Sequence, residues 1–156
     1  MTSEIQLVRI LKEKGLTITT AESLTGGMVS AAIIKVPGAS AVFNQGFVTY
    51  SAESKVKTLG ISQELIDLKG VICPDCAKQM AEGALKITGA DVAISTTGNA
   101  GPDTLEYKPV GRVYIAVSIN GETTISEHTY TGERDSIRRQ TTNAAIREAV
   151  NRLSAL

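Results

Sequence analysis

The sequence predicts an α/β fold, a single three-layer α/β/α domain with a mixed, mostly parallel sheet and an antiparallel hairpin. Helical patterns alternate with short β-rich runs over most of the chain, which is typical of strands that lie between covering helices. Two further strand-like runs flank Asn120-Gly121, a strong signal for a hairpin. One domain over 1–156 is expected, because a chain of this length can bury a sufficient core.

Hydrophobic periodicity and capping signals indicate the elements in order. A helix is expected from Ser3 to Gly15, because Gln6 stands three residues after Ser3, as in a capping box. A β-rich run over 17–20 precedes an alanine-rich helix over 28–34. The remaining expected elements are a strand over 43–50, a helix capped by Ser51, a short helix over 62–68, a helix after Pro74, a strand over 91–97, a hairpin of 110–119 and 123–131, and a helix from Glu133.

Composition argues against several classes of function. Sixteen Lys and Arg balance sixteen Asp and Glu, and tryptophan is absent, so no strong positive field or base stacking favours nucleic acid. No apolar run approaches the ~20 residues of a membrane span, and the start of the chain lacks a signal-peptide pattern. The expected location is therefore the cytoplasm. The single histidine, His128, gives little basis for a histidine triad or a multi-histidine metal site.

The stretch 20–27 joins the β-rich run to the next helix and places Ser23 at the junction. Gly26 and Gly27 stand where the first helical turn is expected, although each glycine costs roughly 1 kcal/mol relative to alanine inside a helix. Their unshielded N–H groups can approach an oxyanion or a phosphate. Ser23 is therefore a candidate nucleophile beside an anion site near Thr25, Gly26 and Gly27. The alternative is that Ser23 or Thr25 only caps the helix.

Lys55 is expected in the first or second turn of the helix that Ser51 caps, close to the positive end of the helix dipole. A cation is disfavoured there, and burial would lower the lysine pKa further. A neutral Lys55 near Ser23 could act as a general base. The alternative is a solvated lysine.

The end of the expected strand over 91–97 is a second candidate region, with Thr97, Gly98 and Gly101 as candidate binding residues. The segment 98–102 is not a dinucleotide fingerprint, because Pro102 and the polar run after it do not open a helix. A loop at the carboxyl end of a central strand is nevertheless where open α/β sheets bind ligands.

Two arginines of the last helix are candidate ligands for an anionic group. Asp135 and Arg139 can pair at i, i+4, whereas Arg134 and Arg138 repel each other at the same spacing. Arg134 and Arg138 therefore lack an obvious local partner and could bind a phosphate or a carboxamide. Arg138, one turn inside the helix, is preferred for the phosphate over Arg134 near its start. The alternative is a solvated basic face.

Cys73 and Cys76 form a C-x-x-C that invites a redox interpretation, since this spacing can lower a thiol pKa at a helix start. The pair does not follow a strand of a βαβ unit, and two cysteines cannot complete a zinc site alone. We therefore expect no redox or metal role for them.

The ordered motifs resemble the CinA C-terminal domain family, whose stand-alone members are nicotinamide-nucleotide amidases. The resemblance covers nearly the whole chain. The segments that carry it are Ala21-Glu22-Ser23-Leu24-Thr25-Gly26-Gly27, Val36-Pro37-Gly38-Ala39-Ser40, Phe47-Val48-Thr49-Tyr50-Ser51 with Lys55, Gly98-Asn99-Ala100-Gly101-Pro102, Lys108-Pro109-Val110-Gly111, and Gly132-Glu133-Arg134 with Arg138.

The resemblance implies an amidohydrolase of pyridine nucleotide salvage, which converts the carboxamide of nicotinamide mononucleotide to nicotinate mononucleotide and ammonia. In that interpretation Ser23 attacks the amide carbon, Lys55 takes the serine proton, and Tyr50 relays or orients it. Backbone amides near Thr25 to Gly27 or in the loop at Gly98 would hold the oxyanion. No metal or organic cofactor is implied. The expected partner is the nucleotide, and a homodimer or higher homo-oligomer is left open.

Two departures from the family pattern leave a second function open. Asp103-Thr104-Leu105-Glu106-Tyr107 replaces a glycine-rich bend, and Asn99 stands where an aliphatic residue is common. Because an altered loop can change substrate preference or activity, the alternative is a catalytically weak or inactive nucleotide-binding or regulatory module of the same fold. A third alternative, a small redox protein, depends only on Cys73 and Cys76.

Overall fold

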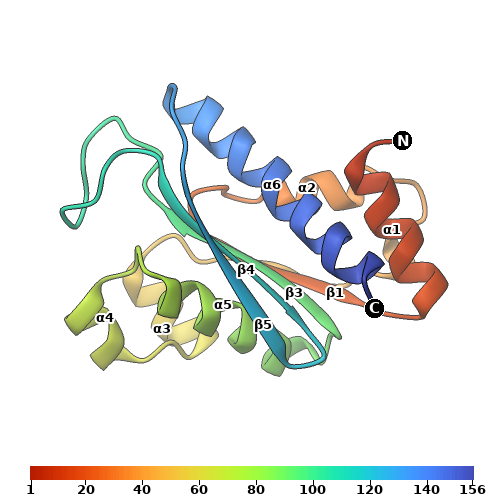
Figure 1. Ribbon diagram of the computed structural model, residues 1–156. Coiled ribbons are helices and arrows are strands. Elements are labelled where there is room, and N and C mark those ends of the chain that lie inside the picture. The colour runs from red at the N-terminus through yellow and green to blue at the C-terminus, as the bar shows by residue number, and fades with distance from the viewer.

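The computed structural model describes residues 1–156 as a five-stranded sheet between two layers of helices (Figure 1). Helices α1, α2 and α6 cover one face of the sheet, and α3, α4 and α5 cover the other. The predicted α/β class with three layers is therefore confirmed. The elements are α1 (Ser3–Lys14), β1 (Ile18–Glu22), α2 (Met28–Ile34), the 3-10 turn η1 (Ala39–Ala41), β2 (Phe47–Val48), α3 (Ala52–Leu59), α4 (Gln63–Lys69), α5 (Pro74–Thr88), β3 (Val92–Gly98), β4 (Arg112–Ile119), β5 (Glu122–Thr129) and α6 (Arg134–Ser154).

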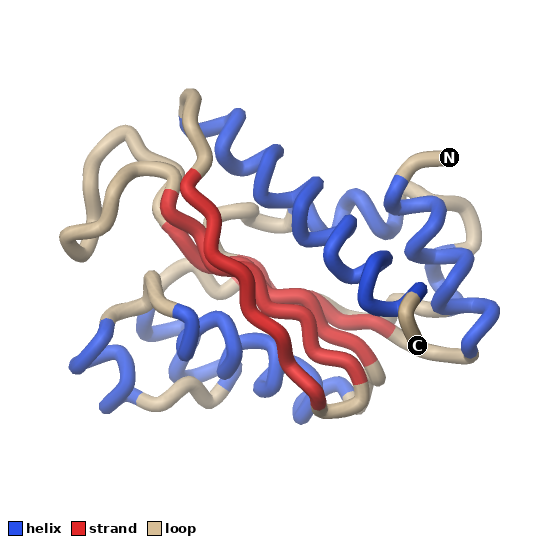
Figure 2. Tube along the Cα trace, in the orientation of Figure 1, coloured by secondary structure: helices blue, strands red, loops and turns tan.

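The sheet is mixed, with the strand order β2-β1-β3-β4-β5. Figure 2 shows the strands side by side between the two groups of helices. Strand β1 runs parallel to both β2 and β3, whereas β4 runs antiparallel to both β3 and β5. The predicted hairpin is present as β4 and β5. Its turn residues Asn120 and Gly121 both have positive φ, at 51° and 86°. This is the backbone that a two-residue hairpin turn requires.

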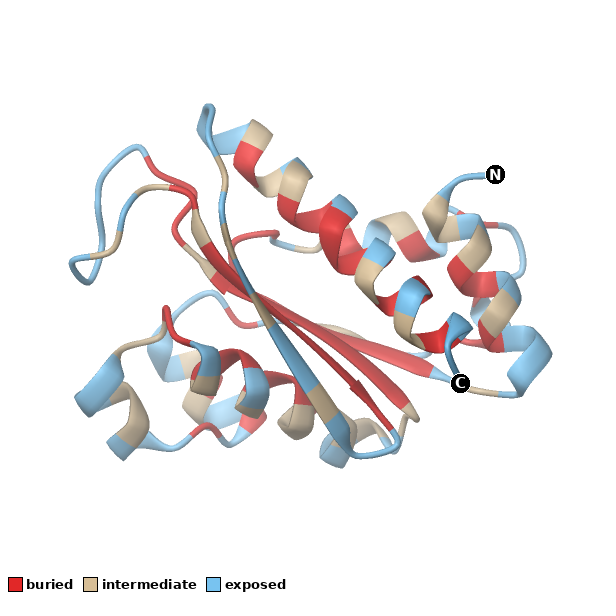
Figure 3. Cartoon of the chain, viewed as in Figure 1, coloured by how far each residue is buried: buried red, intermediate tan, exposed pale blue.

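The core lies on both faces of the sheet (Figure 3). On the side of α1, α2 and α6, a cluster of 20 buried residues includes Leu7, Val29, Ile94 and Ile146. A smaller cluster on the side of α5 includes Met80. Burying one such side chain fully contributes about 1.5–3 kcal/mol, so these clusters make the sheet a rigid base for the loops at its edge. None of the helices combines the length and apolar character that a bilayer crossing requires.

Two local predictions are wrong. The strand expected over 43–50 is reduced to Phe47–Val48, and Phe43 forms only an isolated bridge to Ile18. At Gly46, between them, the chain passes so close to β1 that an added Cβ would lie 2.3 Å from Thr20 Oγ1. The capping box expected at Ser3 is absent, because Thr2 is the N-cap residue of α1 and its side chain makes no capping bond.

The three parallel strands end at the same edge of the sheet, and the candidate residues lie there. Ser23 follows β1, Tyr50 follows β2 by two residues, and Gly98 ends β3. Because α2 contacts β1 on one face and α5 contacts it on the other, β1 lies between helices on both faces. Crevices of this kind are where open α/β sheets bind ligands.

Candidate active site

The centre of the site is a contact between Ser23 and Lys55. Helix α3 presents Lys55 because Ser51 caps it, with Ser51 Oγ accepting from Ser54 N at 3.0 Å. Lys55 Nζ lies 2.9 Å from Ser23 Oγ and 2.7 Å from the carbonyl oxygen of Thr49. Lys55 is 0% exposed and Ser23 is 6% exposed, so the solvated-lysine alternative is wrong.

The surroundings of Lys55 favour its neutral form. Burial lowers the pKa of the Lys55 amine below its ordinary value of 10.5, and the charge of Glu106 opposes this only in part. The Cys76 thiol supplies no charge at neutral pH, because burial raises its pKa to about 12. Every hydrogen-bond partner of Lys55 is an uncharged oxygen: Ser23 Oγ and the carbonyls of Thr49 and Tyr50.

A neutral amine fits these partners atom by atom. It has two N–H groups and one lone pair, and a carbonyl oxygen can only accept. In the neutral form, the two N–H groups can donate to the carbonyls of Thr49 and Tyr50, at 2.7 and 3.3 Å. The lone pair can then accept the hydroxyl proton of Ser23, 2.9 Å away, which is the geometry a general base needs.

The turn after Ser23 differs from the expected anion site. Gly26 and Gly27 precede α2 with φ of 56° and 102°, and Gly27 is its N-cap residue. Gly26 N donates to Ser23 O at 3.1 Å and Gly27 N donates to Glu22 Oε1 at 3.2 Å, so the expectation of free amides at these glycines is wrong. The amides of Leu24 and Thr25 have no acceptor within the protein, which makes them the available donors of this turn.

Glu22 was not predicted as a site residue, and its carboxylate binds the amides at the start of α2. Glu22 is 0% exposed and accepts from the backbone amides of Gly27, Val29 and Ser30. The available signal was an acidic residue within reach of a helix start, where the helix dipole favours negative charge. Thr25 also donates to Glu22 instead of capping the helix, so the capping alternative for Ser23 and Thr25 is wrong as well.

Tyr50 contributes two separate groups. Its backbone carbonyl accepts from Lys55 Nζ, whereas its hydroxyl accepts from Arg134 Nη2 at 2.9 Å. The Tyr50 side chain is 64% exposed. The phenol therefore lies at the solvent side of the site, and the carbonyl contacts the candidate base.

Both candidate arginines have partners, contrary to expectation. Arg134 Nη1 donates to the carbonyl of Gly101, so Arg134 joins the loop after β3 to Tyr50. Arg138 Nε donates to Leu24 O at 2.8 Å and Arg138 Nη2 to Thr25 O at 3.4 Å.

The carboxylate of Asp135 is also shared. Its oxygens accept from Arg138 Nη1 at 3.1 Å and from Arg139 Nη1 at 3.3 Å. Arg138 therefore holds the serine turn with part of its guanidinium paired to a carboxylate. Arg134 contacts only neutral oxygens, which leaves its charge uncompensated at the exposed start of α6.

The loop after β3 is anchored at two points. Asn99 Nδ2 donates to Asp103 O, and Asn99 Oδ1 accepts from Gly101 N, both at 2.8 Å. The Glu106 carboxylate accepts from the amides of Val71 and Ile72, at 3.0 and 2.9 Å. Asn99 thus holds the loop to itself, and Glu106 fixes it to the segment before α5.

Thr97 and Gly98 lie in β3 and are less accessible than expected. The Thr97 hydroxyl donates to Val71 O at 2.8 Å. An added Cβ at Gly98 would lie 2.6 Å from Arg112 O, which explains the glycine by the close approach of β4. Both residues therefore have structural partners that the sequence did not reveal.

Cys73 and Cys76 are both reduced and buried. Cys73 Sγ accepts from Cys76 N at 3.4 Å and so caps α5. No group of three His, Cys, Asp or Glu side chains is placed to hold a metal ion.

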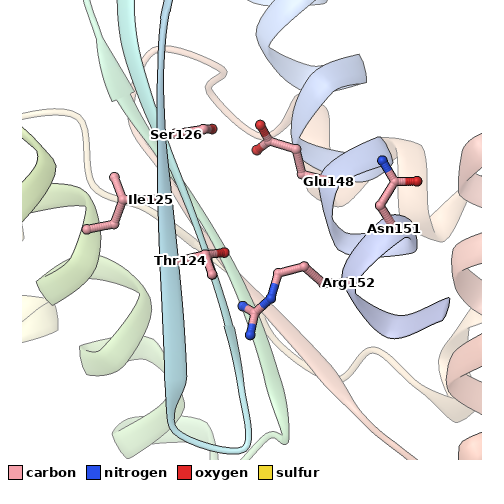
Figure 4. Close-up of a pocket in the computed structure, with 6 residues that line it drawn as sticks. All are labelled: Thr124, Ile125, Ser126, Glu148, Asn151 and Arg152. Carbon is pink, nitrogen blue, oxygen red and sulfur yellow. The ribbon is translucent and has the colours of Figure 1, made fainter. Parts of the chain in front are cut away.

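A separate polar hollow lies between β5 and the end of α6, away from Ser23 (Figure 4). Its charged groups already have partners. Glu148 Oε1 lies 3.1 Å from His128 Nε2, and Arg152 donates to the carbonyls of Val117 and Glu122. The lining residues are Thr124, Ile125, Ser126, Glu148, Asn151 and Arg152.

Comparisons with known proteins agree with one another. The family model for the CinA C-terminal domain matches residues 2–153. A relative from Caldicellulosiruptor saccharolyticus, whose name describes competence-damage induction and no reaction, is 48% identical over 146 residues. That match covers 93% of this chain and 36% of the relative, so the chain spans about a third of the relative's length.

Solved structures show the same fold. A CinA superfamily protein from Klebsiella pneumoniae is similar with a TM-score of 0.96 and 30% identity, over 99% of this chain and 97% of that chain. A competence/damage-inducible protein from Agrobacterium tumefaciens is similar with a TM-score of 0.90 and 36% identity, again over 99% and 97% of the two chains.

Proposed function

Because the chain belongs to the CinA C-terminal domain family, we propose that it hydrolyses the carboxamide of nicotinamide mononucleotide, giving nicotinate mononucleotide and ammonia. The observation that carries the proposal is the buried contact between Ser23 and Lys55, in which the amine faces only uncharged oxygens. The choice of substrate depends on the family resemblance, and the choice of mechanism depends on this contact.

The first half of the reaction forms an acyl-enzyme. Ser23 Oγ attacks the amide carbon while Lys55 Nζ takes the serine proton. The amides of Leu24 and Thr25 would stabilise the oxyanion, and one such donor is worth ~3 kcal/mol in typical cases. Lys55 then gives its proton to the leaving nitrogen, so ammonia departs and Ser23 remains esterified.

The second half releases the acid. A water molecule attacks the ester carbon, Lys55 takes a proton from that water, and Ser23 leaves with a proton returned through Lys55. The role of Tyr50 is to orient the Lys55 amine by its backbone carbonyl. The three partners of Lys55 hold the amine in place through both halves of the reaction.

Arg134 replaces Arg138, the choice made from the sequence, as the candidate for the substrate phosphate, because Arg138 already bonds to Leu24, Thr25 and Asp135. Its guanidinium contacts a carbonyl and a phenol and no carboxylate, so a phosphate would compensate its charge. Arg138 would support catalysis indirectly, since its bonds to the carbonyls of Leu24 and Thr25 hold the turn whose amides face the oxyanion.

The test measures ammonia release from nicotinamide mononucleotide by wild type and by Ser23→Ala. We expect release by wild type, and loss of at least about a thousandfold in Ser23→Ala with an unchanged circular dichroism spectrum. Ser40→Ala, an exposed serine on the 3-10 turn, is the matched control and should keep full activity.

Most of the activity surviving in folded Ser23→Ala would remove the serine from the mechanism. Nucleotide binding by wild type without ammonia release would instead favour a binding or regulatory module. The anchoring of residues 103–107 through Glu106 is the observation that keeps this second candidate in view.

A further inference from the structure

The Glu22 side chain is buried in an environment made entirely of donors. Oε1 accepts from Thr25 Oγ1 at 2.6 Å, Gly27 N at 3.2 Å and Val29 N at 2.9 Å. Oε2 accepts from Ser30 N at 3.0 Å and Ser30 Oγ at 2.7 Å. Backbone N–H groups can only donate, so this position calls for an acceptor with two oxygens, which is a carboxylate.

The carboxylate sets the direction of a chain of hydroxyl hydrogen bonds. Thr25 uses its single proton toward Glu22, so its oxygen must accept from Thr96 Oγ1, which lies 2.8 Å away. Thr96 Oγ1 then accepts from Ser23 N at 3.4 Å. The backbone carbonyl of Thr96 accepts from the same amide at 3.1 Å. The Glu22 carboxylate is thereby connected to the backbone amide of Ser23 by hydrogen bonds through the hydroxyls of Thr25 and Thr96.

A second branch from Glu22 leads away from the site. Ser30 donates to Glu22 Oε2, so Ser30 Oγ accepts from Thr20 Oγ1 at 2.7 Å. Thr20 and Thr96 are both 0% exposed, and each is two hydrogen bonds from the same carboxylate. Only Thr96 continues to Ser23, so the two threonines form a natural pair of test and control.

We propose that Glu22 is a positioning residue for Ser23: its carboxylate holds the serine turn through Thr25 and Thr96. Because Glu22 also takes the amides of Gly27, Val29 and Ser30, the amides of Leu24 and Thr25 are the ones left for the reacting oxygen. The inference rests on the proposed function only in taking Ser23 as a nucleophile, and it does not depend on which amide is the substrate.

The test uses a fluorophosphonate probe, in which the serine oxygen bonds to phosphorus and fluoride leaves. Wild type, Glu22→Gln, Thr96→Val and the control Thr20→Val are compared by two readouts. One is the fraction of protein that is labelled at completion, and the other is the rate constant of labelling. A purely structural defect lowers the fraction of protein that is labelled at completion. Misplacement of Ser23 leaves this fraction unchanged and lowers the rate constant of labelling.

We expect Thr96→Val and Glu22→Gln to lower the rate constant by about tenfold or more, since each loses a hydrogen bond of the chain. Thr20→Val should stay within about twofold of wild type. The midpoint of the pH dependence of labelling should not move in Thr96→Val, because the burial of Lys55 and its contacts with the carbonyls of Thr49 and Tyr50 are unchanged.

Equal rate constants for Thr96→Val and Thr20→Val would overturn the proposal, whether or not Glu22→Gln folds. Absence of labelling in wild type would overturn it too, because there would be no nucleophile to position. Labelled wild type that releases no ammonia from nicotinamide mononucleotide would instead refute the amidase proposal, and the comparison of the two threonines would stand.

Discussion

Replacing Lys55 by methionine tests whether the buried amine is neutral in the folded protein. Methionine keeps most of the length of lysine and lacks the titrating group. The Lys55 pKa is lowered from 10.5 in the folded state by burial, whereas in the unfolded chain it returns to its ordinary value. Between the lowered pKa and 10.5, the unfolded wild type therefore binds one proton more than the folded wild type.

The sign and the size of the effect follow from proton linkage. In this pH window the free energy of unfolding of wild type rises with pH by up to about 1.4 kcal/mol per pH unit for one proton. Lys55→Met has no such proton. The free energy of unfolding of wild type should thus increase relative to that of Lys55→Met as pH rises, and the difference should level off above pH 10.5.

The assay is urea unfolding followed by circular dichroism from pH 6 to 10, because the chain has no tryptophan for fluorescence. Lys57→Met is the control, since Lys57 lies in the same helix but is exposed and pairs with Glu53. A constant difference between wild type and Lys55→Met over this range would refute the reasoning. Lys55 would then keep its proton beside Ser23 and could not act as the base.

Three further predictions concern groups around this pair. Arg134→Ala should raise KM about 10- to 100-fold for nicotinamide mononucleotide and much less for the riboside, whereas Arg138→Ala should lower kcat for both. Steady-state kinetics on the two substrates checks this. An equal rise of KM for both substrates in Arg134→Ala would exclude a phosphate contact. Glu106→Gln removes a charge that raises the Lys55 pKa, so the rise of activity with pH should begin at lower pH, and an unmoved profile would contradict the coupling. Cys76, with a pKa of about 12, should resist iodoacetamide at pH 8 until the protein is unfolded, as mass spectrometry would show.

Local signals in the sequence predicted the fold class and the places of Ser23 and Lys55 in it, and the family resemblance favoured the catalytic interpretation of Lys55. The pattern of a β-run, a serine and two glycines placed Ser23 at the end of a strand, and the Ser51 cap placed Lys55 in the first turns of α3. Both signals act within a few residues, which is the range over which capping and periodicity are readable. The contact between them joins residues 32 apart, so local signals could not show it; the resemblance implied it, and the structure gives its length of 2.9 Å.

Long-range contacts are what the sequence could not show. The hydrogen bonds from Arg138 to Leu24 and Thr25 span more than 110 residues. For this reason Arg134 and Arg138 looked unpartnered in the sequence. Glu22 was overlooked because its five donors come from a turn and a helix start whose path is fixed only by packing. Tyr50 was expected to relay or orient the serine proton, and the group of Tyr50 that contacts Lys55 is its backbone carbonyl.

The alternation of side chains along β1 explains how Glu22 and Lys55 can both be buried near Ser23 without contacting each other. Ala21 packs with Cys76 on the α5 side, and Glu22 turns to the opposite face and bonds the start of α2. Ser23 turns back to the first face and meets Lys55. The sheet backbone thus separates the carboxylate from the amine. If the register of β1 slipped by one residue, Glu22 would face Lys55, their attraction would favour the protonated amine, and the base would be lost.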